Sequence, residues 1–152
     1  MQVPNYKECE GLSQQVGTAL MNKEHEIKVR VRYSETDAMG VVHHANYFQY
    51  FEMGRTEMLR TSGTSYHDME RSGAYIVVVK ADCRYLRPAR YDDVLTILTT
   101  VTRVTGARIE HEYRVLRGDE LLVVGHTVLA VVDRNGKLLP VPEWLRPDTQ
   151  KG

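Results

Sequence analysis

One aspartate lies shortly before the long helix that the sequence predicts. Asp37 stands in the loop-like segment Ser34–His44, and a helical pattern begins near Tyr47. The first turn of a helix carries N–H groups without intrahelical partners and a partial positive charge. Such a helix end can polarise a carbonyl oxygen while an ionised carboxylate attacks the carbonyl carbon or activates a water beside it. An aspartate in this place often does no more than turn the loop, and the spacing alone leaves both roles open.

The elements on either side of this loop follow from hydrophobic periodicity. Apolar and basic residues alternate over Glu26–Ser34, as in a half-buried strand. A helix is predicted over Tyr47–Thr61, with Asn46 as its N-cap, because an asparagine side chain can accept a bond from an early helical N–H. The apolar face of this helix has helical spacing and contains Tyr47, Tyr50, Phe51, Gly54 and Met58. Gly54 costs about 1 kcal/mol of helix propensity relative to alanine, so we expect a strand to approach the helix backbone closely there.

Four strand-like runs follow the helix and are separated by turn signals. They are Ala74–Leu86, Asp93–Val104, Ile109–Val115 and Leu121–Val132. The order of one strand, one long helix and four strands predicts an α+β fold. In this fold the helix covers one face of a five-stranded, mainly antiparallel sheet.

The composition is that of one globular domain. We expect a flexible arm over residues 1–23, a single domain over 24–147 and a tail over 148–152. The 20 basic and 20 acidic residues cancel, which excludes a broad basic surface for nucleic acid or an anionic membrane. No apolar run approaches the ~20 residues that span a bilayer. The two cysteines form neither a disulfide framework nor a zinc motif, so a cytoplasmic location is expected.

The stretch Tyr33–Arg60 resembles the signature of the 4-hydroxybenzoyl-CoA thioesterase family of hotdog-fold enzymes. It is most similar to the branch of small bacterial acyl-CoA thioesterases. The matching residues are Tyr33, Thr36, Asp37, Gly40, Val41, Val42, His44, Asn46, Tyr47, Phe51, Glu52, Arg55 and Glu57. A second match lies at Ala81–Asp93, where the family has a tyrosine, a proline and an aspartate at this spacing. The resemblance covers roughly Glu26–Arg146 and implies a hotdog fold.

The resemblance also implies an activity, which is hydrolysis of an acyl-CoA thioester to the free acid and coenzyme A without a cofactor. Asp37 would act as a nucleophile that forms a mixed anhydride, or as a general base toward water. The oxyanion hole would be a backbone N–H at His44, with Gly40 or Val41 as further donors. Folds of this kind generally assemble as dimers or tetramers with sites shared across an interface, so a homodimer or homotetramer is expected.

Several neighbouring side chains are candidates for substrate contact. Because adjacent side chains usually diverge and no third ligand is recognisable, His43 and His44 do not predict a metal site. His44 occupies the family's histidine position, while His43 stands where close relatives commonly have tyrosine and Met39 replaces a residue that is often smaller. We therefore expect Met39 and His43 near the acyl group. Asn46 and Tyr47 are further candidates, with helix capping and core packing as their alternative roles.

Arginines surround the later strands, and Arg87 and Arg90 are candidates for holding the phosphates of coenzyme A. A solvated basic face is the alternative. The sequence does not choose between them.

Two other functions use the same residues. Hotdog hydratases pair an aspartate with a histidine in a different motif, and the residues around Asp37 do not match it. A non-enzymatic module that binds acyl-CoA is the second alternative, and retention of the whole Asp37–Tyr47 motif argues against it. The acyl group and its carrier, coenzyme A or acyl carrier protein, depend on pocket depth and surface charge, which the sequence does not reveal.

Overall fold

The computed structural model of the chain describes residues 23–146. The predicted tail and nearly all of the predicted arm lie outside the described residues, so these two boundaries stay predictions. The described elements are β1 (Glu24–Arg30), α2 (Asn46–Thr61), α3 (Tyr66–Arg71), β2 (Tyr75–Tyr85), β3 (Val94–Val104), β4 (Arg108–Arg117), β5 (Glu120–Val132) and β6 (Leu138–Leu139). Within this part of the chain, no helix is long and apolar enough to cross a membrane. The cytoplasmic location stays a prediction.

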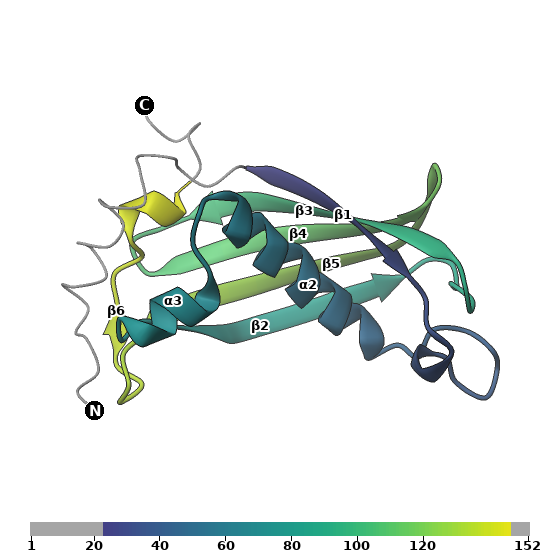
Figure 1. Cartoon of the computed structure of the whole chain (residues 1–152), viewed down its shortest axis with the longest axis horizontal. Coiled ribbons are helices and arrows are strands. Elements are labelled where there is room, and N and C mark those ends of the chain that lie inside the picture. The colour runs from purple at the N-terminus through teal and green to yellow at the C-terminus, as the bar shows by residue number, and fades with distance from the viewer. Residues whose placement is uncertain (1–22, 147–152) are drawn as a thin grey trace.

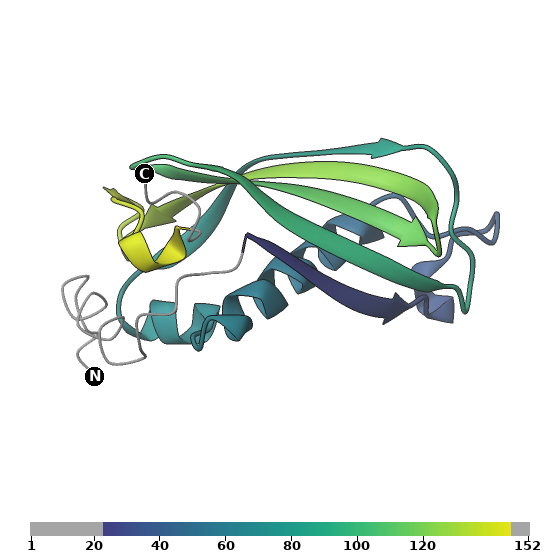
Figure 2. The ribbon, with the colours of Figure 1, turned by 90° about the horizontal axis from the view of Figure 1, so that it is seen from above.

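The five long strands form one antiparallel sheet in the order β1-β3-β4-β5-β2, and the short β6 pairs with the end of β5. The long helix α2 lies across one face of this sheet (Figures 1 and 2). The α+β fold predicted from the order of elements is therefore confirmed. The two-residue β6 is an addition to the five predicted strands.

Two glycines allow α2 to seat on the sheet. A Cβ on Gly54 of the helix would lie 2.4 Å from Thr99 Oγ1 on β3, so this strand approaches the helix backbone as predicted. A Cβ on Gly125 of β5 would lie 2.2 Å from the ring of Phe51. The five residues of the predicted apolar helix face are all buried.

Two local predictions around the loop are wrong. The first strand ends at Arg30, and a short 3-10 helix at Tyr33–Glu35 turns Tyr33 outward, where it is 78 % exposed. Asn46 is not the N-cap, because the cap position is Ala45 and no side chain caps the helix. The Asn46 side-chain amide instead donates to the backbone carbonyl of Glu35 at 2.7 Å. Tertiary contacts therefore replace the predicted local cap.

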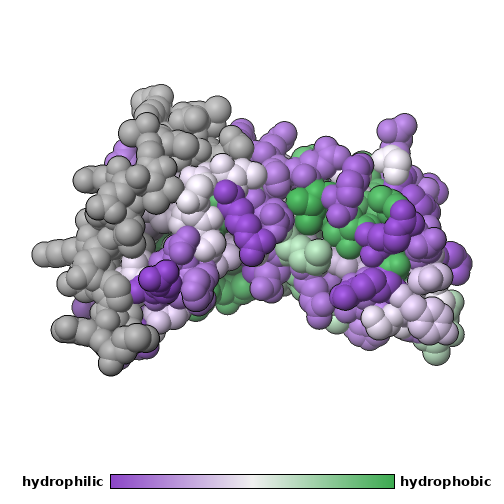
Figure 3. Space-filling model, in the orientation of Figure 1, coloured by the Kyte–Doolittle hydropathy of each residue, from purple (hydrophilic) through white to green (hydrophobic). Residues whose placement is uncertain are grey.

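Strand β2 forms an open edge of the sheet. It pairs with β5 on one side, and in the described residues no strand pairs with its other side. Three consecutive valines on it, Val77, Val78 and Val79, are 38 %, 51 % and 50 % exposed. On the face seen in Figure 3, the largest apolar patch lies in the right half of the view. An exposed apolar strand edge is a template for pairing with another chain.

Candidate active site

The loop that carries Asp37 is closed by backbone bonds. A bridge pairs Thr36 with Val42, and the Asp37 N–H donates to the Val41 carbonyl at 2.8 Å. Gly40 has a φ of +79°, and its N–H donates to the Asp37 carbonyl at 2.9 Å. Glycine adopts this left-handed conformation without steric cost. The tight turn therefore reverses the chain. Asp37 lies beside Val41 and Val42, which belong to the segment that leads to the helix.

The Asp37 carboxylate has one bound and one free oxygen. Oδ1 accepts the N–H of Met39 at 2.9 Å and that of Val41 at 3.4 Å. Oδ2 has no hydrogen-bond or ion-pair partner among residues 23–146. The aspartate therefore turns the loop through one oxygen and leaves the other available for chemistry. The N–H groups of Gly40 and Val41 are both taken up by Asp37, so in this geometry they hold the aspartate instead of facing an oxyanion.

The turn before α2 is heavily hydrogen bonded. The His43 N–H donates to the Glu35 carbonyl at 2.9 Å, and the His43 carbonyl accepts the Asn46 N–H at 3.0 Å. The Ala45 N–H donates to His43 Nδ1 at 3.2 Å, and the Ala45 carbonyl accepts the Phe48 N–H at 3.3 Å. These bonds satisfy all four backbone groups of His43 and Ala45.

His44 differs from these neighbours. Its carbonyl accepts the hydroxyl of Tyr85 at 2.9 Å, but its N–H has no acceptor in the part of the chain that the structure describes. In a trans peptide the carbonyl and the N–H point in opposite directions. Because the His43 carbonyl accepts the Asn46 N–H, the His44 N–H of the same peptide points away from the first helical turn. A free donor at a positive helix end is suited to bind an oxyanion.

The two histidine rings stack instead of diverging as expected. Their centroids are 4.2 Å apart, with 28° between the ring planes. The bond from Ala45 to His43 Nδ1 turns the first ring back over the turn, which brings it against the second. Both side chains are exposed.

Tyr85 is a residue of this site that the sequence reasoning missed. It ends β2, and its ring lies 6.5 Å from that of His44 and 5.6 Å from that of Tyr47. Burial and the neighbouring Cys83 raise the pKa of Tyr85 to about 12, so the hydroxyl remains a donor at neutral pH. The available signal was its place in the second matching segment, three residues before Pro88.

Two other predicted contact residues differ in exposure. Tyr47 is 2 % exposed within the core, where burial raises the pKa of its hydroxyl. Met39 is 80 % exposed at the tip of the loop. The structure thus exposes Met39 beside Asp37 and buries Tyr47 in the core.

The predicted phosphate-binding arginines have different surroundings. Arg87 Nη1 lies 3.4 Å from Glu120 Oε1. Arg90 pairs with Val41 through a backbone bridge, its Nη1 would be 4.0 Å from a Cβ on Gly40, and its guanidinium has no ion-pair partner among the described residues. The structure therefore brings Arg90 to the Asp37 loop and leaves its charge unneutralised.

Another arginine, Arg117, holds the segment that carries Arg90. It donates to the Pro88 carbonyl at 3.3 Å and to Asp93 Oδ2 at 2.8 Å. Asp93 Oδ2 also accepts the Arg90 N–H at 2.8 Å. Burial acts to raise the pKa of Asp93, but these bonds outweigh it and hold the pKa below its ordinary value. The sequence reasoning did not single out Arg117.

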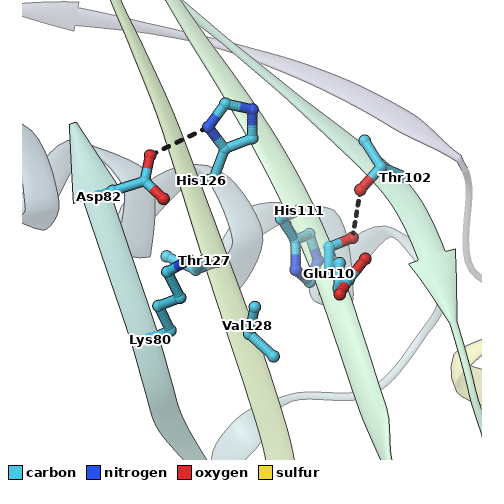
Figure 4. Close-up of a pocket in the computed structure, with 8 residues that line it drawn as sticks. All are labelled: Lys80, Asp82, Thr102, Glu110, His111, His126, Thr127 and Val128. Carbon is cyan, nitrogen blue, oxygen red and sulfur yellow. Dashed lines mark hydrogen bonds and ion pairs between the residues drawn. The ribbon is translucent and has the colours of Figure 1, made fainter. Parts of the chain in front are cut away.

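A pocket of about 240 Å³ lies elsewhere, among β2, β3, β4 and β5 (Figure 4). Asp82 and His126 point toward each other across neighbouring strands there, with Oδ1 and Nδ1 3.1 Å apart. None of the predicted site residues lines it. No set of three or more His, Cys, Asp or Glu in residues 23–146 is arranged to hold a metal ion.

A family model, a related protein and two solved structures that match this chain are each described as a thioesterase or as thioesterase-like. A family model described as the thioesterase-like superfamily matches residues 31–148. The acyl-CoA thioesterase YbgC of Haemophilus influenzae is 41 % identical over 115 residues, which are 74 % of this chain and 83 % of that protein. The probable thioesterase from Bartonella henselae has a TM-score of 0.76 and 34 % identity, covering 78 % of this chain and 99 % of the other. The DHNA-CoA thioesterase from Staphylococcus aureus has a TM-score of 0.73 and 29 % identity, covering 78 % and 80 %. The predicted hotdog fold is confirmed.

Proposed function

The chain belongs to the thioesterase-like superfamily, and we propose that it hydrolyses an acyl-CoA thioester at the loop between Asp37 and α2. The names of its relatives support the substrate class. One observation carries the proposal. Among the six backbone groups of residues 43–45, only the His44 N–H lacks a partner within the described chain, which leaves it available to donate to a thioester oxygen that develops negative charge.

The His44 N–H and the positive end of α2 stabilise this oxyanion. The donor is held before the substrate arrives, so the reaction spends no free energy on aligning it. A single donor of this kind lowers the barrier by about 3 kcal/mol in comparable sites. This stabilisation speeds the addition step whether Asp37 or water adds to the carbonyl.

Asp37 Oδ2 drives the addition in one of two ways. As a nucleophile, it attacks the thioester carbon, the coenzyme A thiolate leaves and takes up a proton, and water then hydrolyses the acyl-aspartyl anhydride. As a general base, it accepts a proton from water as the water adds, and the tetrahedral intermediate expels the thiolate. Both routes use the oxygen that has no partner within the described chain.

Substrate contacts beyond the reacting atoms come from the rim of the loop. Arg90 is the better candidate for a coenzyme A phosphate, because it has no ion-pair partner among the described residues, whereas Arg87 pairs with Glu120. Met39 and His43 are exposed beside the loop and contact the acyl thioester. Asn46 and Tyr47 support the site without contacting the substrate, because Asn46 binds the Glu35 carbonyl and Tyr47 lies in the core. Membership of the 4-hydroxybenzoyl-CoA thioesterase family is part of this proposal, and the acyl group is left to the thioester panel.

Self-association through β2 completes the proposed enzyme as a homodimer or homotetramer. The edge of β2 is open among the described residues, and its three exposed valines supply apolar area. Antiparallel pairing of two such edges around a two-fold axis uses the same surface on both copies. This would satisfy the free backbone groups of the edge and bury the valines.

Release of free thiol from a panel of acyl-CoA thioesters tests the function. The panel pairs aliphatic with hydroxylated aromatic acyl groups, and the parent is compared with Asp37→Asn, which is nearly the same size. We expect the substitution to lower kcat by roughly 10² or more, the scale of a missing acid–base or nucleophilic group, with unchanged oligomer size. Thioester binding without release would favour the non-enzymatic module. Addition of water to an unsaturated acyl-CoA would favour the hydratase, and full activity of Asp37→Asn would exclude the mechanism.

A further inference from the structure

The peptide between His44 and Ala45 is held at both of its polar groups. Its carbonyl accepts the Tyr85 hydroxyl at 2.9 Å, and its N–H donates to His43 Nδ1 at 3.2 Å. These two contacts come from different directions. One belongs to the turn itself, whereas the other comes from the end of β2, 41 residues along the chain.

Tyr85 makes the long-range one of these two hydrogen bonds. The residues His43–Ala45 are exposed and precede the first residue of α2. N–H groups of α2 bond to the carbonyls of His43 and Ala45 but not to that of His44.

The carbonyl and the N–H of His44 belong to two different peptides that share the His44 Cα. A contact that holds the carbonyl therefore restrains ψ of His44 and the position of the Cα beside the N–H. Glu35 holds the neighbouring residues His43 and Asn46, but among the described residues the His44 carbonyl itself is held by Tyr85.

We propose that Tyr85 is a positioning residue whose hydroxyl fixes the His44 carbonyl and thereby aims the His44 N–H at the oxyanion. This inference rests on the proposed function, since it assigns a role in the same reaction. The hydroxyl does not touch the substrate. It acts by keeping the donor preorganised, which is the property on which oxyanion stabilisation depends.

The location of Tyr85 separates this role from a role in folding. The side chain is 46 % exposed, so loss of one hydroxyl oxygen removes little packing. Its ring contacts with His44 and Tyr47 are retained in phenylalanine. A Tyr85→Phe substitution therefore removes the bond to the His44 carbonyl while keeping the ring in place.

Steady-state kinetics of Tyr85→Phe on the best thioester of the panel test the proposal. One hydrogen bond is worth roughly 1 kcal/mol, so we expect kcat to fall on the order of tenfold, with KM and the midpoint of thermal unfolding close to those of the parent. Tyr75→Phe is the matched control. Tyr75 lies at the other end of β2, and its hydroxyl makes no hydrogen bond within residues 23–146.

The outcomes separate this proposal from the proposed function. A parent that releases no thiol from any thioester overturns both. An active parent with an unchanged kcat in Tyr85→Phe overturns only the positioning role. A lowered kcat accompanied by a fall in unfolding midpoint much larger than that of Tyr75→Phe assigns Tyr85 to folding and also overturns it.

Discussion

The side-chain amide of Asn46 donates to the backbone carbonyl of Glu35 at 2.7 Å. This bond joins the first residue of α2 to the start of the Asp37 loop. The same carbonyl accepts the His43 N–H at 2.9 Å, so Glu35 ties both ends of the loop together. Glu35 itself is buried, and its Oε1 accepts the Arg32 N–H at 2.7 Å. The carbonyl of this buried residue therefore helps to set the position of Asp37 relative to the helix end.

Asn46→Ala is expected to weaken the connection between α2 and the Asp37 loop. It removes the amide donor, so we expect the free energy of unfolding to fall by about 1 kcal/mol and kcat to fall with it, measured by urea unfolding and thiol release. Gln49→Ala, at an exposed position of the same helix, is the control and should change neither. If Asn46 instead contacts the substrate directly, KM would rise while the unfolding free energy stayed constant.

Arg90→Ala tests phosphate recognition. We expect KM for an acyl-CoA to rise several-fold, because an unpaired guanidinium binds a phosphate through charge-assisted bonds. KM for the matching acyl N-acetylcysteamine thioester, which has no phosphates, should not change. Arg103→Ala, an exposed arginine on β3, serves as the control. An equal rise for both thioesters would contradict phosphate binding by Arg90.

Val78→Lys tests association through β2. A charge placed on the open edge opposes pairing of two copies, so analytical ultracentrifugation should show a shift toward monomer, with lower activity at low protein concentration. Val78 is 51 % exposed, and the comparably exposed Val94, at 42 %, gives Val94→Lys as the control. An unchanged sedimentation profile for Val78→Lys would exclude this edge as the interface.

His111 makes stability depend on pH. It is 3 % exposed, and burial together with the Arg55 charge lowers its pKa from 6.5 to about 3. Its neutral form therefore contributes stability that is fully present above pH 6.5 and is lost progressively as pH falls toward about 3. Between pH 7.5 and 5.5 this costs on the order of 1 kcal/mol in unfolding free energy. His111→Phe should show a correspondingly smaller difference between urea unfolding at these two pH values. Equal pH dependence of both proteins would show that His111 is not the group responsible.

Much of the fold follows from local pattern. The buried face of α2 is visible in the spacing of Tyr47, Phe51 and Met58, because a helix repeats every 3.6 residues. Gly54 signals the close approach of β3 for a similar reason, since few other causes favour glycine within a helix.

The end of β1 was predicted incorrectly because local hydrogen bonds between Arg32 and Glu35 form a 3-10 turn there. The cap of α2 was predicted incorrectly because the Asn46 amide bonds to the more distant Glu35 carbonyl.

The sequence by itself determined the order of strands and helix, the place of Asp37 before the helix, and the family to which these residues point. These features depend on residue types at short spacing. The tertiary structure decided which groups around the site remain free. Met39 and Val41 bind Asp37 Oδ1, whereas Oδ2 has no partner among residues 23–146, and Tyr85 reaches His44 from β2. Backbone donors look alike in every sequence, so their availability depends on chain direction and on contacts between distant segments, which exist only in the folded protein.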